Sequence, residues 1–320
     1  MLIFLHILGN NIIPIFTLIV LGYIVSKKFD LNIFTLSKLN FYIFVPGFIF
    51  YNIYTTNLSF DMLKILLFSI VYLIVNDLIS RIVSKFRKYE IGQENAFKNS
   101  IMFNNTGNIG VSLITLIFGS APYIIDGKTP YLNEALAAQI MILIFMNITM
   151  NTVGLYNAGR AKMNIKESIH KILTMPSIYA MPLALMLKYL KIDITSTPLW
   201  PALEYIKGGL VSIALITLGV QLSKTEFDFR NINVNIAVFT RLIIGPLLAL
   251  ILIHIFRFSG IIAQTLLISY SVPTAVNTAL IAVEYDNEQD FASQEVMVST
   301  ILSAITLTSV IYMAGILFPI

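Results

Sequence analysis

The sequence predicts an all-α polytopic membrane protein with ten transmembrane helices in a five-plus-five inverted repeat. Its 320 residues are 57% hydrophobic and only 12% charged, a balance far from that of soluble domains. Apolar runs of about 20 residues, the length that crosses a bilayer, recur between short charged breaks. Two of these runs are interrupted by helix-breaking residues at corresponding places in the two halves of the chain. No segment is left that could form a large soluble enzyme domain.

Hydrophobic runs and charged breaks define the spans in chain order. The ten predicted spans are 5–26, 36–55, 62–83, 97–119, 134–157, 168–189, 200–222, 233–256, 260–284 and 292–318. No positively charged segment precedes the first run and no small-residue cleavage site follows it. The first run is therefore expected to be a retained span and not a signal peptide.

The distribution of Lys and Arg predicts the orientation. Fourteen of these residues, Lys98 among them, are assigned to the loops after spans one, three, five and seven, and five to the loops on the other side. Cytoplasmic loops carry the excess of Lys and Arg. We therefore expect a multi-pass protein of the cell membrane with both termini extracellular. The same dispersal of cations between apolar runs argues against a nucleic-acid partner, despite the net charge of +4.

Several kinds of chemistry are not expected. The chain has no Cys, and its three His residues, His6, His170 and His254, are far apart. Neither a nucleophile–base pair nor metal-ligand spacing is visible. We expect no enzyme activity, no catalytic residue, no metal and no cofactor.

The fourth and ninth spans are each broken near mid-length. The candidate site residues at these breaks are Asn104, Asn105, Thr106, Gly107 and Asn108 in span four, and Ser271, Pro273, Thr274, Asn277 and Thr278 in span nine. The span that follows each break carries a Gln near its start, Gln139 or Gln294. Five spans in each half, 1–160 and 161–320, give the halves opposite orientations, which is typical of secondary transporters.

Physical reasons favour a binding site at the breaks. Gly costs about 1 kcal/mol and Pro about 3 kcal/mol in a helix interior. Unwound backbone at membrane depth is tolerated only where it is buried in protein or lines a cavity, so the two breaks should meet. The half-helix after each break directs free N–H groups and a positive dipole end at that point, which suits an anion. The alternative is that the Asn and Thr residues only cap the broken helix ends.

The segments NNTGNIGVSL, SVPTAVNTALIAVEYDNEQDFASQEVMVSTILSAITL and LITLGVQLSK together resemble the auxin efflux carrier family, and the resemblance covers essentially the whole chain. It implies a fold similar to that of bile acid sodium symporters. Spans one, two, six and seven would form a scaffold and the interface of a homodimer. Spans three to five and eight to ten would form a transport domain that moves like an elevator.

The resemblance also implies that an organic carboxylate binds where the fourth and ninth spans cross. The matching positions are Asn105 or Asn108 in span four, with Pro273, Thr274 and Asn277 in span nine. Gly107 departs from the family, because plant members commonly have Pro there.

Ionisable residues inside spans are candidates for coupling or support. Asp77 and Arg81 lie four residues apart on one helix face. With Gln139 they match the place where related symporters bind sodium. Permanent pairing of Asp77 with Arg81 would make a cation unnecessary, titration of Asp77 would imply proton coupling, and an interface pair without a coupling role is the third alternative. Arg241, half-way into span eight, is either an anion counter-charge or a snorkelling side chain.

The sequence leaves three functions open. The leading interpretation is a secondary carrier of a small organic carboxylate. A sodium- or proton-coupled symporter of a similar anion is the first alternative, and the lack of Asp or Glu in spans four and nine, except for Glu284, argues against it. The second alternative is a membrane sensor that keeps the transporter fold without transporting. The particular carboxylate and the direction of transport are not determined by the sequence.

Overall fold

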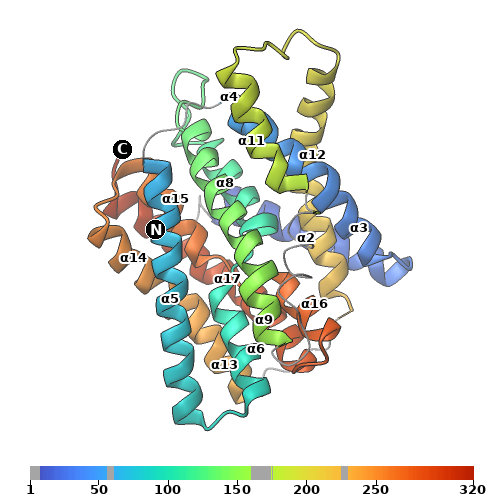
Figure 1. Cartoon of the computed structure of the whole chain (residues 1–320), viewed down its shortest axis with the longest axis vertical. Coiled ribbons are helices and arrows are strands. Elements are labelled where there is room, and N and C mark those ends of the chain that lie inside the picture. Colours follow the sequence, from blue (N-terminus) through green and yellow to red (C-terminus); the bar gives the residue numbers. More distant parts are fainter. Residues whose placement is uncertain (1–7, 56–60, 160–173, 175, 225–229) are drawn as a thin grey trace.

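The computed structural model describes residues 8–55, 61–159, 174, 176–224 and 230–320. Every regular element in these residues is a helix (Figure 1). In chain order, with the π-helical turns labelled η, they are η1 (Leu8–Ile12), α2 (Ile13–Lys28), α3 (Ile33–Leu39), η2 (Asn40–Phe44), α4 (Val45–Thr55), α5 (Asp61–Arg87), α6 (Ile91–Met102), η3 (Thr106–Gly110), α7 (Val111–Phe118), α8 (Leu132–Thr149), η4 (Met150–Gly154), α9 (Leu155–Ala158), α11 (Pro176–Tyr189), α12 (Leu199–Leu222), α13 (Ile232–Phe239), η5 (Thr240–Ile244), α14 (Gly245–Ile255), α15 (Gly260–Ser271), α16 (Val276–Glu284) and α17 (Gln289–Leu317).

The lengths and composition of these helices confirm an all-helical polytopic membrane protein. In the described part of the chain, seven continuous helical stretches are long and apolar enough to cross a bilayer. Three shorter apolar helices, Thr106–Phe118, Ile178–Tyr189 and Gly260–Ser271, accompany them. The beginnings of predicted spans one and six lie outside the described residues. The count of ten spans stays a prediction.

Helix α5 shows how the sequence divides between lipid and protein. Apolar side chains at helical spacing form an exposed stripe along it: Leu63, Leu67, Ile70, Ile74, Leu78 and Ile82. The other face buries Phe68, Ser69, Tyr72 and Asn76. Exposed to water, this apolar stripe would be unfavourable, but it is favourable against the hydrocarbon of a bilayer. Polar side chains on α5 therefore lie on the face that packs against protein.

One group of helices consists of α2, α3–η2–α4, α11 and α12, which lie together on one side of the molecule (Figure 1). Helices α2 and α12 pack very closely. A Cβ atom on Gly219 would lie 1.9 Å from the Ile19 carbonyl oxygen, and one on Gly22 would lie 2.2 Å from that of Ile216. Small residues allow this backbone approach, which is a common means of association between helices in membranes.

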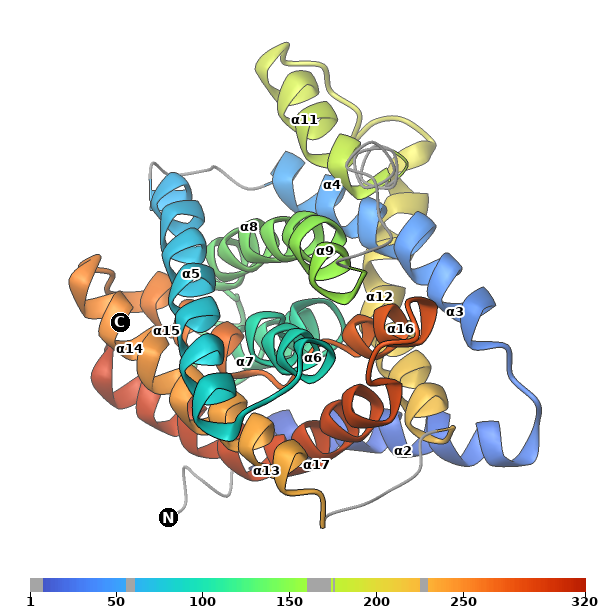
Figure 2. The same ribbon diagram turned by 60° about the horizontal axis from the view of Figure 1, so that its bottom comes forward.

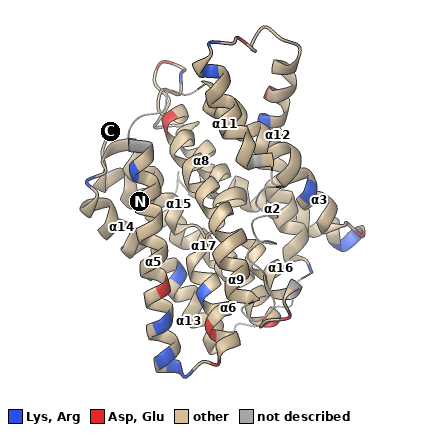
Figure 3. Cartoon of the chain, viewed as in Figure 1, with Lys and Arg blue, Asp and Glu red and all other residues tan. Residues whose placement is uncertain are grey.

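The second group contains the interrupted helices. Helices α6, α7, α15 and α16 lie among α5, α8, α13 and α17, as Figure 2 shows. The C-terminal ends of α6 and α15 lie close together. After each end the chain continues into a new helical segment, η3–α7 after α6 and α16 after α15. The Lys and Arg residues near α5 and α6 gather toward one end of this group (Figure 3).

Candidate functional site

The fourth predicted span is broken after α6. Helix α6 ends at Met102, Phe103 is extended, and helical structure resumes at Thr106. The ninth predicted span is broken after α15, where Val272 is extended and α16 begins at Val276. Pro273 cannot donate the backbone hydrogen bond that would continue α15. The predicted breaks are therefore present, and each leaves four residues or fewer outside a helix.

The two breaks meet and pair with each other. The Asn105 amide donates to the Pro273 carbonyl at 2.7 Å, and the Ala275 amide donates to the Phe103 carbonyl at 2.9 Å. Asn104 and Thr274 form an antiparallel bridge between these bonds. We call residues 103–105 and 272–275 the crossover. Its pairing satisfies backbone groups that no water would reach at membrane depth.

The two consecutive asparagines of the first break are buried and only partly satisfied. The Asn104 amide nitrogen donates to the Ser269 carbonyl at 2.7 Å. The Asn105 side-chain oxygen accepts from the Asn108 backbone amide at 3.3 Å, which caps η3. Among the described residues, the Asn104 side-chain oxygen and the Asn105 side-chain nitrogen are buried without a partner. Hydrogen bonds within the protein therefore account for one of the two polar atoms of each side chain. The other atom of each is available to a polar ligand.

The residues after this break have different surroundings. The Thr106 carbonyl accepts from the Gln139 side-chain nitrogen at 2.9 Å. Asn108 accepts from the Asn40 side-chain nitrogen at 3.3 Å, a contact between the two helix groups. At Gly107 a Cβ atom would lie 3.5 Å from Leu143 Cδ1, which is ordinary van der Waals contact.

Two hydroxyl groups at the second break donate to backbone carbonyls three or four residues earlier in the chain. Ser271 donates to the Leu267 carbonyl at 2.6 Å, and Thr278 donates to the Ala275 carbonyl at 2.7 Å. Thr274, by contrast, contacts the Ser100 carbonyl and Glu295 Oε1, each at 2.8 Å. Asn277 lines a cavity beside the crossover.

This cavity lies between the two helix groups and is narrow, with a volume of about 30 Å³, the space of roughly one water molecule. Its walls include five asparagines, Asn104, Asn105, Asn108, Asn147 and Asn277, together with Phe41, Val45, Phe103, Thr106, Gly107, Leu143, Met146, Met150, Ala275 and Val276. Asn147 of α8 was not among the predicted site residues. An Asn within the apolar run of span five is the sequence signal that would have found it.

Of the predicted trio Asp77, Arg81 and Gln139, the structure pairs Asp77 with Arg81, while Gln139 has other partners. Asp77 pairs with Arg81 at 2.7 Å and with Lys98 at 2.9 Å. Lys98 is the more enclosed partner, since its side chain is 8% exposed against 62% for Arg81. Gln139 instead lies beside the crossover, where it donates to the Thr106 carbonyl of η3 and accepts from the Ser269 hydroxyl of α15. The assignment of Lys98 to a loop was wrong, because α6 already begins at Ile91.

Arg241 is completely buried, so the snorkelling alternative was wrong. Its guanidinium group donates to the carbonyls of Val272 at 3.1 Å, Ile101 at 3.0 Å and Tyr270. These carbonyls lie at the C-terminal ends of α6 and α15, where helix dipoles place partial negative charge. Arg241 thus holds the ends of both interrupted helices together. Its role as an anion counter-charge stays a prediction.

Helix α17 also contributes a residue that contacts the crossover. Glu295 is completely buried, and its Oε1 atom lies 2.8 Å from Thr274 Oγ1. Sequence reasoning missed it, because the search for acidic residues was confined to the broken spans themselves. Gln294, which was predicted, is half-buried, and its side-chain oxygen has no hydrogen-bond partner among the described residues.

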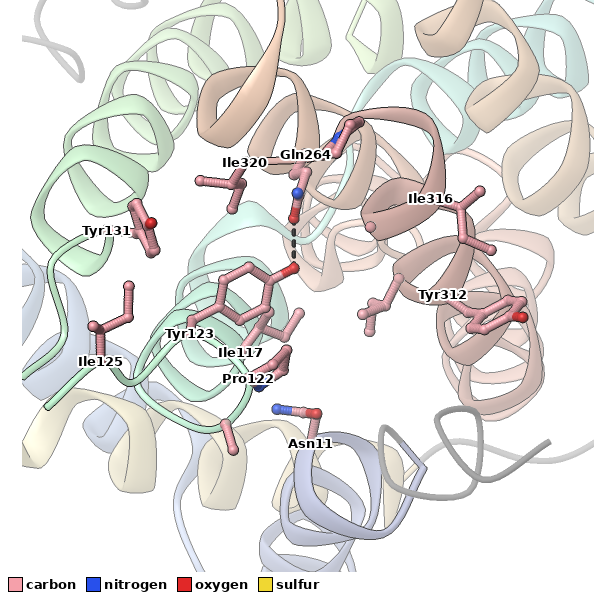
Figure 4. A pocket seen from close by; sticks show the side chains of 14 residues that line it. Asn11, Ile117, Pro122, Tyr123, Ile125, Tyr131, Gln264, Tyr312, Ile316 and Ile320 are labelled. Carbon is pink, nitrogen blue, oxygen red and sulfur yellow. Dashed lines mark hydrogen bonds between the residues drawn. The ribbon is translucent and has the colours of Figure 1, made fainter. Parts of the chain in front are cut away.

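A larger cavity of about 410 Å³ lies elsewhere, at the ends of α7 and α17. Figure 4 shows Tyr123 directed at Gln264 in its wall, with an O···O distance of 2.6 Å. Burial raises the pKa of the Tyr123 phenol, which therefore stays a neutral donor at physiological pH. The lining residues include no Lys, Arg or His. This cavity is less suited to a carboxylate than the Asn-rich site.

Apolar spanning helices and two paired breaks around a polar cavity define a membrane transporter. The sequence pattern of the family described as "Membrane transport protein" matches residues 8–312. The chain belongs to this family, which confirms the resemblance to auxin efflux carriers.

Two relatives are informative. The chain is 24% identical over 315 residues to an "Uncharacterized transporter" of Methanothermobacter thermautotrophicus, an alignment that covers 93% of this chain and 95% of that protein. It is 26% identical over 117 residues to a "Putative malonate transporter" of Rhizobium meliloti, which covers 36% of this chain and 37% of that protein.

Proposed function

We propose that this protein is a secondary transporter that carries a small organic carboxylate anion across the cell membrane. The observation that carries the proposal is the Asn-rich cavity at the crossover of two interrupted helices. The family membership and the name of the Rhizobium meliloti relative, which points to malonate, support it.

Neutral donors account for the choice of a carboxylate. The Asn105 side-chain nitrogen is buried and has no partner in the described structure, and Asn277 and Asn147 line the same cavity. The stretch Thr106–Phe118 and helix α16 both begin beside this cavity, so their N-terminal dipole ends favour negative charge there. A small dicarboxylate such as malonate offers four oxygens to these donors.

The proposed architecture is the ten-span inverted repeat, with residues 1–160 as the first half and 161–320 as the second. Seven long and three short apolar helices support this count. The group of α2, α3–η2–α4, α11 and α12 is the proposed scaffold and forms the proposed homodimer interface. The other helices are the proposed transport domain. The orientation with both termini extracellular is part of the same proposal and rests on the distribution of Lys and Arg.

The position of the cavity supports an elevator-type mechanism. Phe41 and Val45 of the proposed scaffold close one side of it, and the crossover of the proposed transport domain forms the other. A volume of about 30 Å³ cannot hold a dicarboxylate, so binding requires the two groups to separate. Sliding of the transport domain along the scaffold would open the cavity to one side of the membrane at a time.

Counterflow into liposomes tests the proposal. The purified protein, reconstituted and preloaded with malonate, should accumulate labelled malonate, and a thermal-shift screen against other carboxylates should identify better ligands. Asn277→Leu and Asn108→Leu should each weaken binding roughly tenfold to a hundredfold, because a charge-assisted hydrogen bond contributes about 1.5–3 kcal/mol. Thr278→Val is the matched control on α16, since its hydroxyl already donates to the Ala275 carbonyl. Equal affinities of the Asn277 and Thr278 variants would contradict the proposed site.

A further inference from the structure

Glu295 is a carboxyl group enclosed at the crossover. It lies in α17 and its exposed fraction is 0%. Its Oε1 atom is 2.8 Å from Thr274 Oγ1. Thr274 belongs to the crossover itself, where it is bridged to Asn104. Because Glu295 and the crossover belong to the same proposed transport domain, the sliding movement that exposes the crossover also changes the surroundings of Glu295.

The hydrogen bonds of the Thr274 hydroxyl indicate the protonation state of the Glu295 carboxyl group. Thr274 Oγ1 lies 2.8 Å from two acceptors, the Ser100 carbonyl oxygen and Glu295 Oε1. A hydroxyl group has one hydrogen to donate. With an ionised carboxylate, one of the two short O···O contacts would have no hydrogen in it. With a neutral carboxylic acid, Glu295 donates to Thr274 and Thr274 donates to Ser100, so both contacts are hydrogen bonds.

The second oxygen of Glu295 gives an independent argument. Among the described residues, Oε2 is buried and has no hydrogen-bond partner. A buried carboxylate oxygen without a donor is strongly disfavoured, because the charge loses its hydration and gains nothing in return. The carbonyl oxygen of a neutral acid in the same place loses far less. Both oxygens of Glu295 therefore fit the protonated form.

The charges around α17 do not require an ionised Glu295. The elements packed against α17 are η1, α6, α13, η5, α15 and α16. Their ionisable residues with described side chains are Arg241 on η5, Tyr270 on α15, and Glu94 and Lys98 on α6; the side chain of Glu284 on α16 lies outside the described residues. Lys98 pairs with Asp77, and Tyr270 donates to Ser69. Arg241 binds the C-terminal ends of two helices, each equivalent to about −0.5 charge, which together balance its own charge.

We propose that Glu295 carries a proton in this conformation and that its release couples transport of the carboxylate to a proton gradient. This inference rests on the proposed function. When the transport domain slides along the scaffold and water reaches Glu295 from one side of the membrane, its O–H bond breaks, the electron pair stays on the carboxylate and the proton passes to that water. Water on the other side of the membrane supplies the proton that reloads Glu295 when the transport domain faces that side.

Infrared spectroscopy tests the proton without any substrate. The wild-type protein in lipid at neutral pH should show the C=O stretch of a carboxylic acid, and Glu295→Gln should lose that band. Asp290→Asn, at the exposed start of the same helix, is the matched control and should keep it. Identical carboxylic-acid bands in wild type and Glu295→Gln would overturn the assignment.

Transport in proteoliposomes tests the coupling. A pH gradient should change the rate of malonate uptake by the wild type, by Asp290→Asn and by Glu295→Asp, which keeps an ionisable group, whereas Glu295→Gln should lose this response. A wild type indifferent to the pH gradient, an unchanged response in Glu295→Gln, or a requirement for sodium would each overturn proton coupling. If no variant moves any carboxylate, the proposed function fails, while the infrared band still decides whether Glu295 holds a proton.

Discussion

Replacement of Arg241 by Gln separates a structural role of this cation from a role in anion binding. Arg241 donates to carbonyls at the ends of both α6 and α15. A Gln side chain is shorter and has one amide nitrogen, so it cannot reach all three oxygens. The substitution leaves buried carbonyls without donors and removes a charge that balances two helix ends. We expect a loss of several kcal/mol of stability, because each buried polar group left without its partner costs about 1–3 kcal/mol.

The assay is thermal unfolding of the purified protein in detergent, followed by size-exclusion chromatography of the heated sample. Arg241→Gln should melt several degrees below the wild type, and Arg241→Lys should fall between them because it keeps the charge without the guanidinium fork. Arg257→Gln, at an exposed position, is the control and should melt like the wild type. If Arg241→Gln melts normally but no longer binds malonate, Arg241 acts on the substrate and our assignment is refuted.

Three further predictions follow from the contacts described above. Asp77→Asn leaves the enclosed Lys98 without its closest carboxylate partner, so it should lower the melting temperature more than Arg81→Gln, which removes an exposed partner; equal effects would contradict the pairing. Gly219→Leu should prevent α2 and α12 from packing, because even a Cβ atom there would lie 1.9 Å from a backbone oxygen; normal folding and elution of this variant would show that the helices can separate. Tags at both chain ends should be accessible from outside intact cells, and a protected C-terminus would contradict the ten-span count.

The breaks were predictable because their causes are local. Pro273 cannot extend α15 with a backbone hydrogen bond, and the Asn-Asn-Thr-Gly-Asn run from Asn104 combines poor helix formers with good caps. The expectation that the breaks meet followed from the cost of unsatisfied backbone in a membrane. Backbone pairing between Asn105 and Pro273 confirms it.

The partners of the buried charges could not be predicted in the same way. The true partners of Arg241 are backbone carbonyls, and since every residue has one, the side-chain sequence does not mark them. Lys98 and Asp77 meet because α6 begins at Ile91 and folds back along α5, whereas element boundaries are the least certain part of a prediction from sequence. Glu295 reaches the crossover from a helix that is not itself broken, and only the packing of α17 against α15 and α16 shows it.

The division of charge around the crossover suits the proposed anion site, which has no fixed cation, on the proposed moving domain. Arg241 is held by the negative ends of α6 and α15 and keeps these partners whether or not a substrate is bound. The cavity on the other side of the crossover presents neutral Asn side chains. If a Lys or Arg held the substrate there, the empty carrier would have to return with an unpaired charge, at a cost of at least about 2.5 kcal/mol. In the proposed mechanism neutral donors avoid this cost, and the proposed proton on Glu295 would keep the empty crossover free of uncompensated charge during the return step.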